Sequence, residues 1–303
     1  MTYEHLIAEF LRTPWALLPE KIQALRLVLA RKMSGETIPD EEIAALKGQS
    51  KSNVSQQRGR VAVLPIVGTL VHRGSGIEES SGVPSILSIG KKFDALMNDP
   101  GIKAIVLDIE SPGGSVYGTK ELGDKIYQAR NDKKIVAIAN ALAASAAYWI
   151  LCQASEAWMK PTGHVGSIGV FMAYCDDSKM MADAGIEMTL ISSGKYKTEG
   201  AYGPLSEEAK SYFQSECDRY YGMFLDAVAR GRGKTTATVQ EKFGQGRVVG
   251  ATEALKAGMV DKVGTLEDVL QSLGISLESQ ASPARLQTPH KRLAAQIDLA
   301  NLE

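Results

Sequence analysis

The stretch Ile135–Cys152, with the sequence IVAIANALAASAAYWILC, decides the fold that we expect for this chain. Its β-branched and small residues before Asn140 predict a buried strand, and its Ala-rich remainder predicts a buried helix. The stretch holds 18 residues without a charge, which is long enough to consider a membrane span. Its Ala content, the polar Asn140 and Ser145, and the lack of a following Lys/Arg cluster favour a core strand that leads into a core helix.

Ser145 lies near this predicted change from strand to helix. A helix N-terminus presents N–H groups without intrahelical partners and the positive end of the helix dipole. This environment suits a serine that carries negative charge in a transition state, and it equally suits an ordinary N-cap serine. Ser145 alone therefore does not decide the function.

Length, charge and cysteine content exclude several classes of protein. The chain has 303 residues, a net charge of -1 and 44% hydrophobic residues, which is enough for one large α/β domain with an appendage. A net charge near zero argues against a nucleic-acid-binding protein. The three cysteines and four histidines are scattered, so neither a disulfide framework nor a metal site is expected. The N-terminal residues lack a long apolar run, so we expect no signal peptide and a cytoplasmic location.

The order of the predicted elements divides the chain into four segments. Residues 1–47 have a helix-forming composition and predict a helical N-terminal segment, and the polar residues 48–59 predict a linker. Strands and helices alternate in residues 60–273, which predicts a largely parallel sheet with crossover helices. The polar residues 274–303 predict a flexible or docking tail. Within the main domain we expect strands at 60–68, 102–108, 135–138, 157–159, 166–171 and 187–191, and helices at 85–98, 116–130, 178–184, 206–232, 236–243 and 251–257.

Two further stretches could join Ser145 in a hydrolytic site. The glycines of Ser111–Gly114 end a predicted strand and expose backbone N–H groups that can form an oxyanion hole, although a plain turn is the alternative. In Gly194–Lys197, a lysine beside an apolar pocket can lose its proton and serve as the general base for a serine. Two solvated surface lysines are the alternative there.

Taken together, these motifs resemble the signal peptide peptidase A family of Ser–Lys proteases, and within it the phage and prophage head-maturation proteases of the lambda protein C type. The resemblance covers about residues 60–270, and Thr13–Leu17 is similar to the N-terminal segment of the phage branch. It rests on motifs that occur in the same order: Ser111–Gly114, Ala144–Tyr148, Gly166–Val170, Gly194–Lys197, and Ala254 with Gly258–Asp261.

The resemblance implies a fold and a role for each matching residue. The fold is that of the crotonase superfamily and the Clp protease subunit, in which ββα units repeat around a mainly parallel sheet. No metal or cofactor is implied. Lys195 matches a more variable position than Lys197 and is the second choice as base. The implied site comprises the nucleophile Ser145, the general base Lys197, the oxyanion-hole amides of Gly113 and Gly114, and the base-orienting hydroxyls of Ser167 and Thr198.

His164 is a competing base, because Clp protease subunits use Ser-His-Asp with the histidine downstream of the serine. It lies 19 residues after Ser145 in a predicted loop, where we favour a histidine at the rim of a pocket. A Ser–Lys enzyme should have an alkaline pH optimum, whereas a Ser–His enzyme should work near neutral pH.

The resemblance implies a serine endopeptidase that cleaves an extended peptide after small or apolar residues. The expected substrates are phage scaffold, portal or capsid proteins, and the expected state is a homo-oligomer with its site shared at interfaces, acting within proheads and without a membrane span or nucleic-acid partner. Three alternatives stay open: a peptidase that degrades signal peptides without a membrane anchor, a non-catalytic capsid assembly factor, and an acyl-CoA enzyme of the crotonase type.

Overall fold

The structure is a computed structural model that describes residues 14–19, 56–73 and 85–275. Most of the expected N-terminal helical segment, of the expected linker and of the expected tail lies outside these ranges. The described strands are β1 (Trp15–Leu17), β2 (Gln56–Arg58), β3 (Val61–Val67), β4 (Ala104–Ser111), β5 (Gly113–Ser115), β6 (Lys134–Ala144), β7 (Glu156–Met159), β8 (His164–Gly166), β9 (Val248–Gly250) and β10 (Lys262–Val263). The described helices are α5 (Ile86–Asn98), α6 (Thr119–Ala129), α7 (Ala146–Leu151), α8 (Ser178–Asp183), α9 (Glu207–Arg232), α10 (Thr236–Lys242), α11 (Ala251–Ala257) and α12 (Leu266–Ser272).

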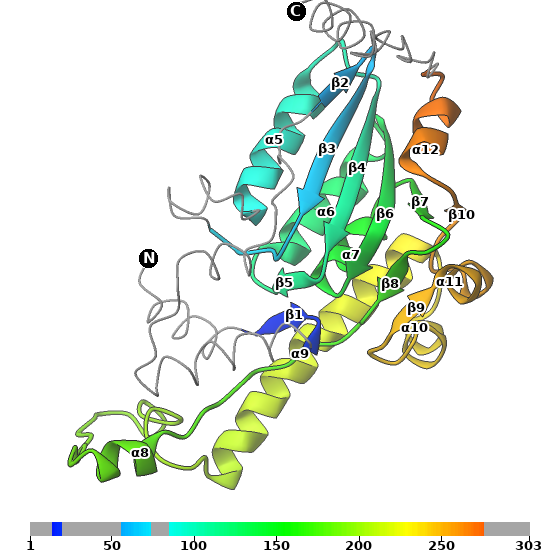
Figure 1. Ribbon diagram of the computed structural model, residues 1–303. Helices are drawn as coiled ribbons and strands as arrows, with labels where there is room; N and C mark the ends of the chain where they lie inside the picture. The colour runs from blue at the N-terminus through cyan, green and yellow to red at the C-terminus, as the bar shows by residue number, and fades with distance from the viewer. Residues whose placement is uncertain (1–13, 20–55, 74–84, 276–303) are drawn as a thin grey trace, which may run out of the picture.

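The centre of the molecule is a mainly parallel sheet (Figure 1). Strands β3, β4, β6 and β7 lie side by side and run parallel. Helices α5, α6 and α7 make the crossovers between them, as parallel strands require. The predicted α/β fold with a mainly parallel sheet is therefore confirmed. None of the described helices combines the length and the apolar composition of a membrane span.

Both faces of this sheet are covered by other elements. Side chains alternate between the two faces along each strand, so each strand contributes to both cores. Leu64 and Leu107 belong to the large core under α5, α6, α7 and α9. Their neighbours Val63 and Val106 face the other way and pack with Val269 of α12. Burial on both faces explains why the sequences of these strands are nearly continuous runs of aliphatic residues.

Strand β6 is longer than predicted. The Ala-rich residues 141–144 continue the strand, and the helix begins only at Ala146. Ala141 has φ 110°, and it separates the part of β6 that pairs with β7 from Leu142–Ala144, which pairs with β8. The ladder with β8 outweighs the helix propensity of alanine, which is a weak preference.

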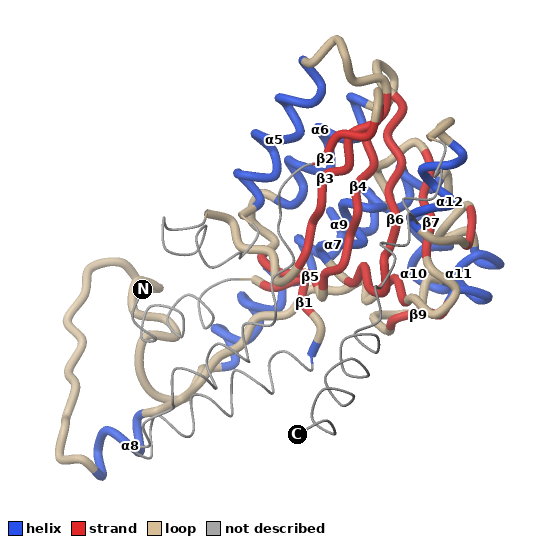
Figure 2. The backbone as a smooth tube through the Cα atoms, turned by 45° about the horizontal axis from the view of Figure 1, so that its top comes forward, coloured by secondary structure: helices blue, strands red, loops and turns tan. Residues whose placement is uncertain are grey.

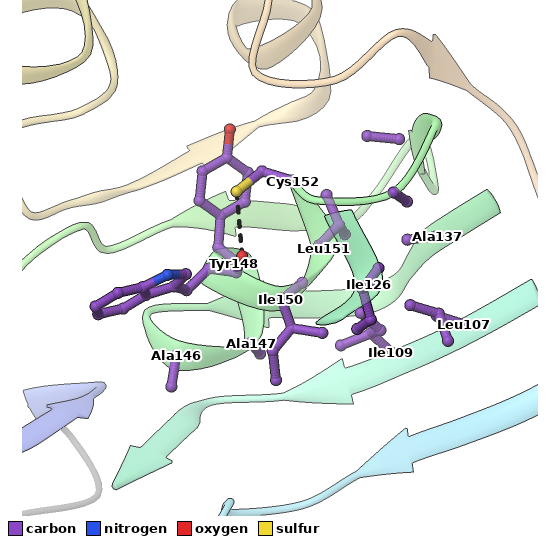
Figure 3. Packing of buried hydrophobic residues seen from close by; sticks show 14 of the residues in the cluster. Leu107, Ile109, Ile126, Ala137, Ala146, Ala147, Tyr148, Ile150, Leu151 and Cys152 are labelled. Carbon is purple, nitrogen blue, oxygen red and sulfur yellow. Dashed lines mark hydrogen bonds between the residues drawn. The ribbon is translucent and has the colours of Figure 1, made fainter. Parts of the chain in front are cut away.

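Helix α7 is buried along its whole length, and Figure 3 shows its side chains among residues of β4, β6 and α6. Trp149 stacks on Phe224 of α9 with ring centroids 4.5 Å apart and planes at 10°. Tyr148 donates its hydroxyl proton to Met259 O at 2.9 Å, and burial raises the pKa of Tyr148 well above its ordinary value. These contacts fix the helix that follows Ser145.

Two short strands occur where the sequence predicted other structure. Trp15–Leu17, in the predicted helical segment, forms β1 and pairs with β5. Gln56–Arg58, in the predicted linker, forms the exposed edge strand β2 and pairs with β3. Both are held by backbone hydrogen bonds, which need no apolar pattern in the sequence.

Two predicted strands are absent or shortened. The strand expected at 166–171 ends at Gly166, because Gly166 and Ser167 have φ 112° and 52° and turn the chain away from the sheet. Residues 187–191 form no strand and are exposed, with no neighbouring strand to pair with among the described residues.

The residues between β8 and α9 form an arm that extends from the body, with α8 towards its far end (Figures 1 and 2). The N-terminal part of α9 runs along this arm, and its C-terminal part returns to the core. Several large apolar side chains of the arm are exposed, and Ile191 is 96% exposed. The arm therefore presents an apolar surface to its surroundings.

Candidate active site

Ser145 joins β6 to α7 in a strained backbone conformation, with φ 57° and ψ -120°. A non-glycine residue in such a conformation costs on the order of 1–3 kcal/mol. Two hydrogen bonds hold it: Ser145 N donates to Gly166 O at 2.7 Å, and Trp149 N donates to Ser145 O at 2.9 Å. Ser145 is 1% exposed, and its Oγ has no hydrogen-bond partner among the described residues. Strain together with an unsatisfied buried hydroxyl is typical of a functional residue.

Gly113 brings β5 against this serine. It has φ +97°, and a Cβ there would lie 2.9 Å from Ser145 Cβ and 2.9 Å from Ala144 O. A larger residue would therefore have to displace the turn that holds the nucleophile candidate. Gly114 is packed as closely, because a Cβ there would collide with Leu70 O. The predicted glycine pair thus lies beside Ser145.

The N–H groups of this glycine pair already face acceptors. Gly113 N donates to Ser111 Oγ at 3.2 Å, and Gly114 lies opposite Ala16 in the β1–β5 ladder. An oxyanion hole built from these amides requires that a substrate carbonyl replaces the present acceptors. The assignment of Gly113 and Gly114 to an oxyanion hole stays a prediction.

Ser167 follows β8, which pairs with the end of β6 so that Ala144 lies opposite Gly166. It is 5% exposed, has φ 52°, and its N donates to Arg247 O at 2.8 Å. It is one residue from Gly166, the acceptor of Ser145 N. Ser145 and Ser167 thus lie at the carboxyl ends of parallel strands, the edge where open α/β sheets bind ligands.

Lys197 and Thr198 lie on the arm, in the coil between α8 and α9. Lys197 is exposed, and its backbone N donates to Gly194 O at 3.1 Å. The arm leads away from the strands that hold Ser145 (Figure 1). The structure therefore does not bring the predicted base, or Thr198, to the predicted nucleophile, and both assignments stay predictions.

Lys195, the second-choice base, is engaged by other groups. Its Nζ donates to Tyr196 OH at 2.6 Å and to Glu208 Oε1 at 3.0 Å. These hydrogen bonds, that to Tyr196 first, raise the pKa of Lys195 above its ordinary value. A general base needs a neutral amine, so this environment disfavours Lys195 in that role.

His164, the competing base, is exposed at the start of β8. It pairs through its backbone with Leu142 on one side and Gly250 on the other. It makes no hydrogen bond to Ser145 Oγ, which has no partner among the described residues. The structure therefore offers no support for a Ser–His pair.

A scan against protein families matches peptidase family S49 over residues 128–279, which is half of the chain. The chain belongs to peptidase family S49. The family resemblance that the motifs predicted is confirmed. The head-tail preconnector protein GP5 of Enterobacteria phage P21 is 28% identical over 291 residues, covering 91% of this chain and 58% of that protein. The capsid assembly protease C of Escherichia phage lambda is 29% identical over 262 residues, covering 84% and 59%.

A putative signal peptide peptidase SppA of Enterococcus faecium is 29% identical to this S49 chain over 181 residues, covering 59% of this chain and 52% of that protein. The S49 chain thus spans somewhat more than half the length of these curated relatives.

The amide of Ala146 is one further candidate oxyanion donor, which the sequence motifs did not indicate. Ala146 is the first residue of α7 and directly follows Ser145. Amides in the first turn of a helix have no intrahelical acceptor, and the amide after a nucleophile at a strand-to-helix turn is a common oxyanion donor. The signal was present in the sequence, because the helix was predicted to start next to Ser145.

Proposed function

We propose that this chain is a serine endopeptidase in which Ser145 is the nucleophile and Lys197 the general base. The observation that carries the proposal is the Ser145 turn: a strained, buried serine with an unsatisfied hydroxyl, packed against Gly113. Membership of peptidase family S49 supports peptide bonds as the substrate. The names of the phage relatives, a capsid assembly protease and a head-tail preconnector protein, support a role in phage or prophage capsid maturation.

The proposed reaction follows the usual course of acyl transfer. Ser145 Oγ attacks the carbonyl carbon of the scissile bond, and its proton passes to the neutral amine of Lys197. The amides of Gly113, Gly114 and Ala146 are the candidate donors to the oxyanion. Lys197 then gives the proton to the leaving amine, and it finally draws a proton from the water that hydrolyses the acyl-serine.

We infer that the arm of one copy delivers Lys197 to the body of another copy. Two observations support this homo-oligomer. Lys197 lies on an arm that leads away from Ser145 of its own chain, and that arm exposes apolar side chains that a neighbouring copy could cover. The exposed apolar residues of the arm are Met180, Ile186, Met188, Leu190, Ile191 and Tyr196.

Cleavage of casein and of a panel of hydrophobic peptides between pH 6 and 10 tests the enzymatic proposal. The wild type should cut, and Ser145→Ala should lose on the order of 10³-fold or more of the rate. Equal cleavage by Ser145→Ala, or no cleavage by the wild type with a co-expressed scaffold protein present, would contradict it. The second result would favour a non-catalytic assembly factor, which the separation of Lys197 from Ser145 also fits.

Mixing two inactive variants tests the shared site. Ser145→Ala supplies an intact Lys197, and Lys197→Ala supplies an intact Ser145. If a site takes one residue from each of two copies, random mixing should restore about a quarter of the wild-type activity. Mixtures that stay inactive after co-refolding would contradict the shared site and leave movement of the arm within one chain.

A further inference from the structure

Strand β1 lies beside β5 as an extended segment (Figure 1). It pairs antiparallel with β5, and Ala16 lies opposite Gly114. Leu18 N donates to Pro112 O at 3.0 Å, and Val116 N donates to Pro14 O at 3.2 Å. One edge of the segment is therefore held along the strand that carries the glycine pair.

The other edge of the same segment is also hydrogen-bonded. Trp15 N donates to Phe171 O at 2.9 Å, and Phe171 N donates to Trp15 O at 3.0 Å. Phe171 lies just after the turn that contains Ser167. An extended segment held by main-chain hydrogen bonds at an open strand edge is the way in which proteins bind peptides by β-augmentation. Here two backbone edges hold residues 14–18 in that way.

The register places the carbonyl of Ala16 at the glycine pair. In an antiparallel ladder, hydrogen-bonded pairs alternate with non-bonded pairs. The pairs of Leu18 with Pro112 and of Pro14 with Val116 are bonded, so Ala16 and Gly114 between them occupy a bonded position. The amide of Gly114, a candidate oxyanion donor, therefore faces Ala16 O.

Ser145 lies at the same carbonyl. A Cβ built on Gly113 would collide with Ala16 O and would lie 2.9 Å from Ser145 Cβ. Ala16 O and Ser145 Cβ thus both lie within 2.9 Å of one point. The peptide bond that follows this carbonyl is Ala16–Leu17.

The side chains of the segment fit the same arrangement. Ala16 is fully buried in the main core, whereas Trp15 and Leu17 point to the opposite face and pack with Phe171 and Ala173. A close-packed core has room for the methyl group of Ala16 and would have to rearrange for a larger one. A small residue before the cut is also what the family resemblance implies for substrates.

We propose that Ala16–Leu17 is a self-cleavage site, presented by the chain to its own Ser145. This inference rests on the proposed peptidase function. Ser145 Oγ bonds to the Ala16 carbonyl carbon, its proton passes through Lys197 to Leu17 N, and the Ala16–Leu17 bond breaks. Water then hydrolyses the acyl-serine, which leaves a carboxylate on Ala16, a free hydroxyl on Ser145 and a new N-terminus at Leu17.

The uncut segment blocks the edge along which a substrate would bind, because it uses the hydrogen bonds of β5 and Phe171. The cut bond no longer ties Ala16 to Leu17, so the segment can leave. Cleavage of other proteins should therefore follow self-cleavage. Because Lys197 lies on the arm, the bond stays intact until the base reaches Ser145.

Intact mass and N-terminal sequencing of the purified wild type and of Ser145→Ala test the site. The same samples are assayed on casein. We expect a wild-type chain that begins at Leu17 and digests casein, and a Ser145→Ala chain with the bond intact. A synthetic peptide with the sequence of residues 12–21 should be cut between Ala and Leu, and its Ala16→Leu version should be cut at least ten-fold more slowly.

A wild type that digests casein while its Ala16–Leu17 bond stays intact overturns this inference and leaves the proposed function standing. Cutting at Ala16–Leu17 in Ser145→Ala as well also overturns it, because another protease is then responsible. A wild type that cuts neither casein nor itself overturns the proposed function together with the inference.

Discussion

Replacing Gly113 by alanine should disturb both the fold and the Ser145 site. The added Cβ would lie 2.9 Å from Ser145 Cβ and from Ala144 O and would collide with Ala16 O, and the backbone is held at φ +97°. The positive φ contributes about 1–2 kcal/mol, and the overlap with backbone atoms adds about 1–3 kcal/mol. We therefore expect a loss of about 2–5 kcal/mol in the free energy of unfolding, which is a fall in Tm of about 4–20 °C for a domain of this size.

The same substitution should reduce peptide hydrolysis by about 100-fold or more, since a displacement of the nucleophile by about 1 Å has that effect. Calorimetry at one protein concentration and a peptide cleavage assay measure the two effects. Gly222→Ala in α9 is the matched control, because a Cβ there meets nothing within 4 Å. It should leave the rate unchanged and raise stability by up to about 1 kcal/mol. A Gly113→Ala protein with wild-type Tm and activity would refute the proposed packing of β5 on Ser145.

Two further predictions concern the framework around the site. Arg232, whose side chain is 7% exposed, donates to the Asp261 carboxylate at 2.5 and 2.9 Å. Burial would raise the pKa of Asp261, but hydrogen bonds from Arg232 and from Ala157 N lower it below its ordinary value. The pair therefore stabilises the fold above pH ~4 and loses its effect as pH falls further. Asp261→Asn should cost about 1–2 kcal/mol at pH 7 and clearly less at pH 3 in urea unfolding, and an equal cost at both pH values would argue against the ion pair. Phe224→Ala removes the stack on Trp149 and should lower the free energy of unfolding, measured by thermal unfolding, by about 3–5 kcal/mol. Tyr212→Ala, on an exposed turn of the same helix, is the control and should lower it by about 0.5 kcal/mol or less. Similar losses for both variants would mean that α9 is not anchored through this stack.

The framework of the fold could be predicted because its patterns are local. The aliphatic runs of β3, β4 and β6 and the amphipathic α5 bury their own side chains, so composition indicates them. Helix α9 begins at the N-cap Ser206, and α11 ends at Gly258 with φ 80°. Both ends follow from rules about single residues.

The elements that were missed depend on distant backbone partners. Strand β1 exists through hydrogen bonds to β5 and to Phe171, and the end of β6 exists through β8. Neither segment has a periodic pattern of apolar residues that would indicate such a partner. The strand expected at 187–191 shows the converse, because its β-forming residues find no neighbouring edge among the described residues.

The residues of the candidate site likewise include some whose position the sequence could predict and one whose position it could not. Gly113, Ser145 and Ser167 follow β4, β6 and β8, which pair in parallel. Their approach to one edge follows from the predicted parallel sheet, because the carboxyl ends of neighbouring parallel strands share an edge. Lys197 lies on an arm that leads away from the strands that hold Ser145, and no pattern in the sequence indicates the course of that arm. Sequence motifs could mark this lysine as a candidate base, but they carry no information on its distance from Ser145 in the folded chain.

The most direct test of the Ser145–Lys197 assignment compares Lys197→Ala with Lys195→Ala in the peptide cleavage assay from pH 6 to 10. The two lysines share the same exposed coil, so one variant controls for the other. We predict a rate that rises towards alkaline pH in the wild type, a loss of about 10²–10⁴-fold in Lys197→Ala, and a rate within about three-fold of wild type in Lys195→Ala. Wild-type activity in Lys197→Ala, or loss of activity in Lys195→Ala alone, would contradict the assignment.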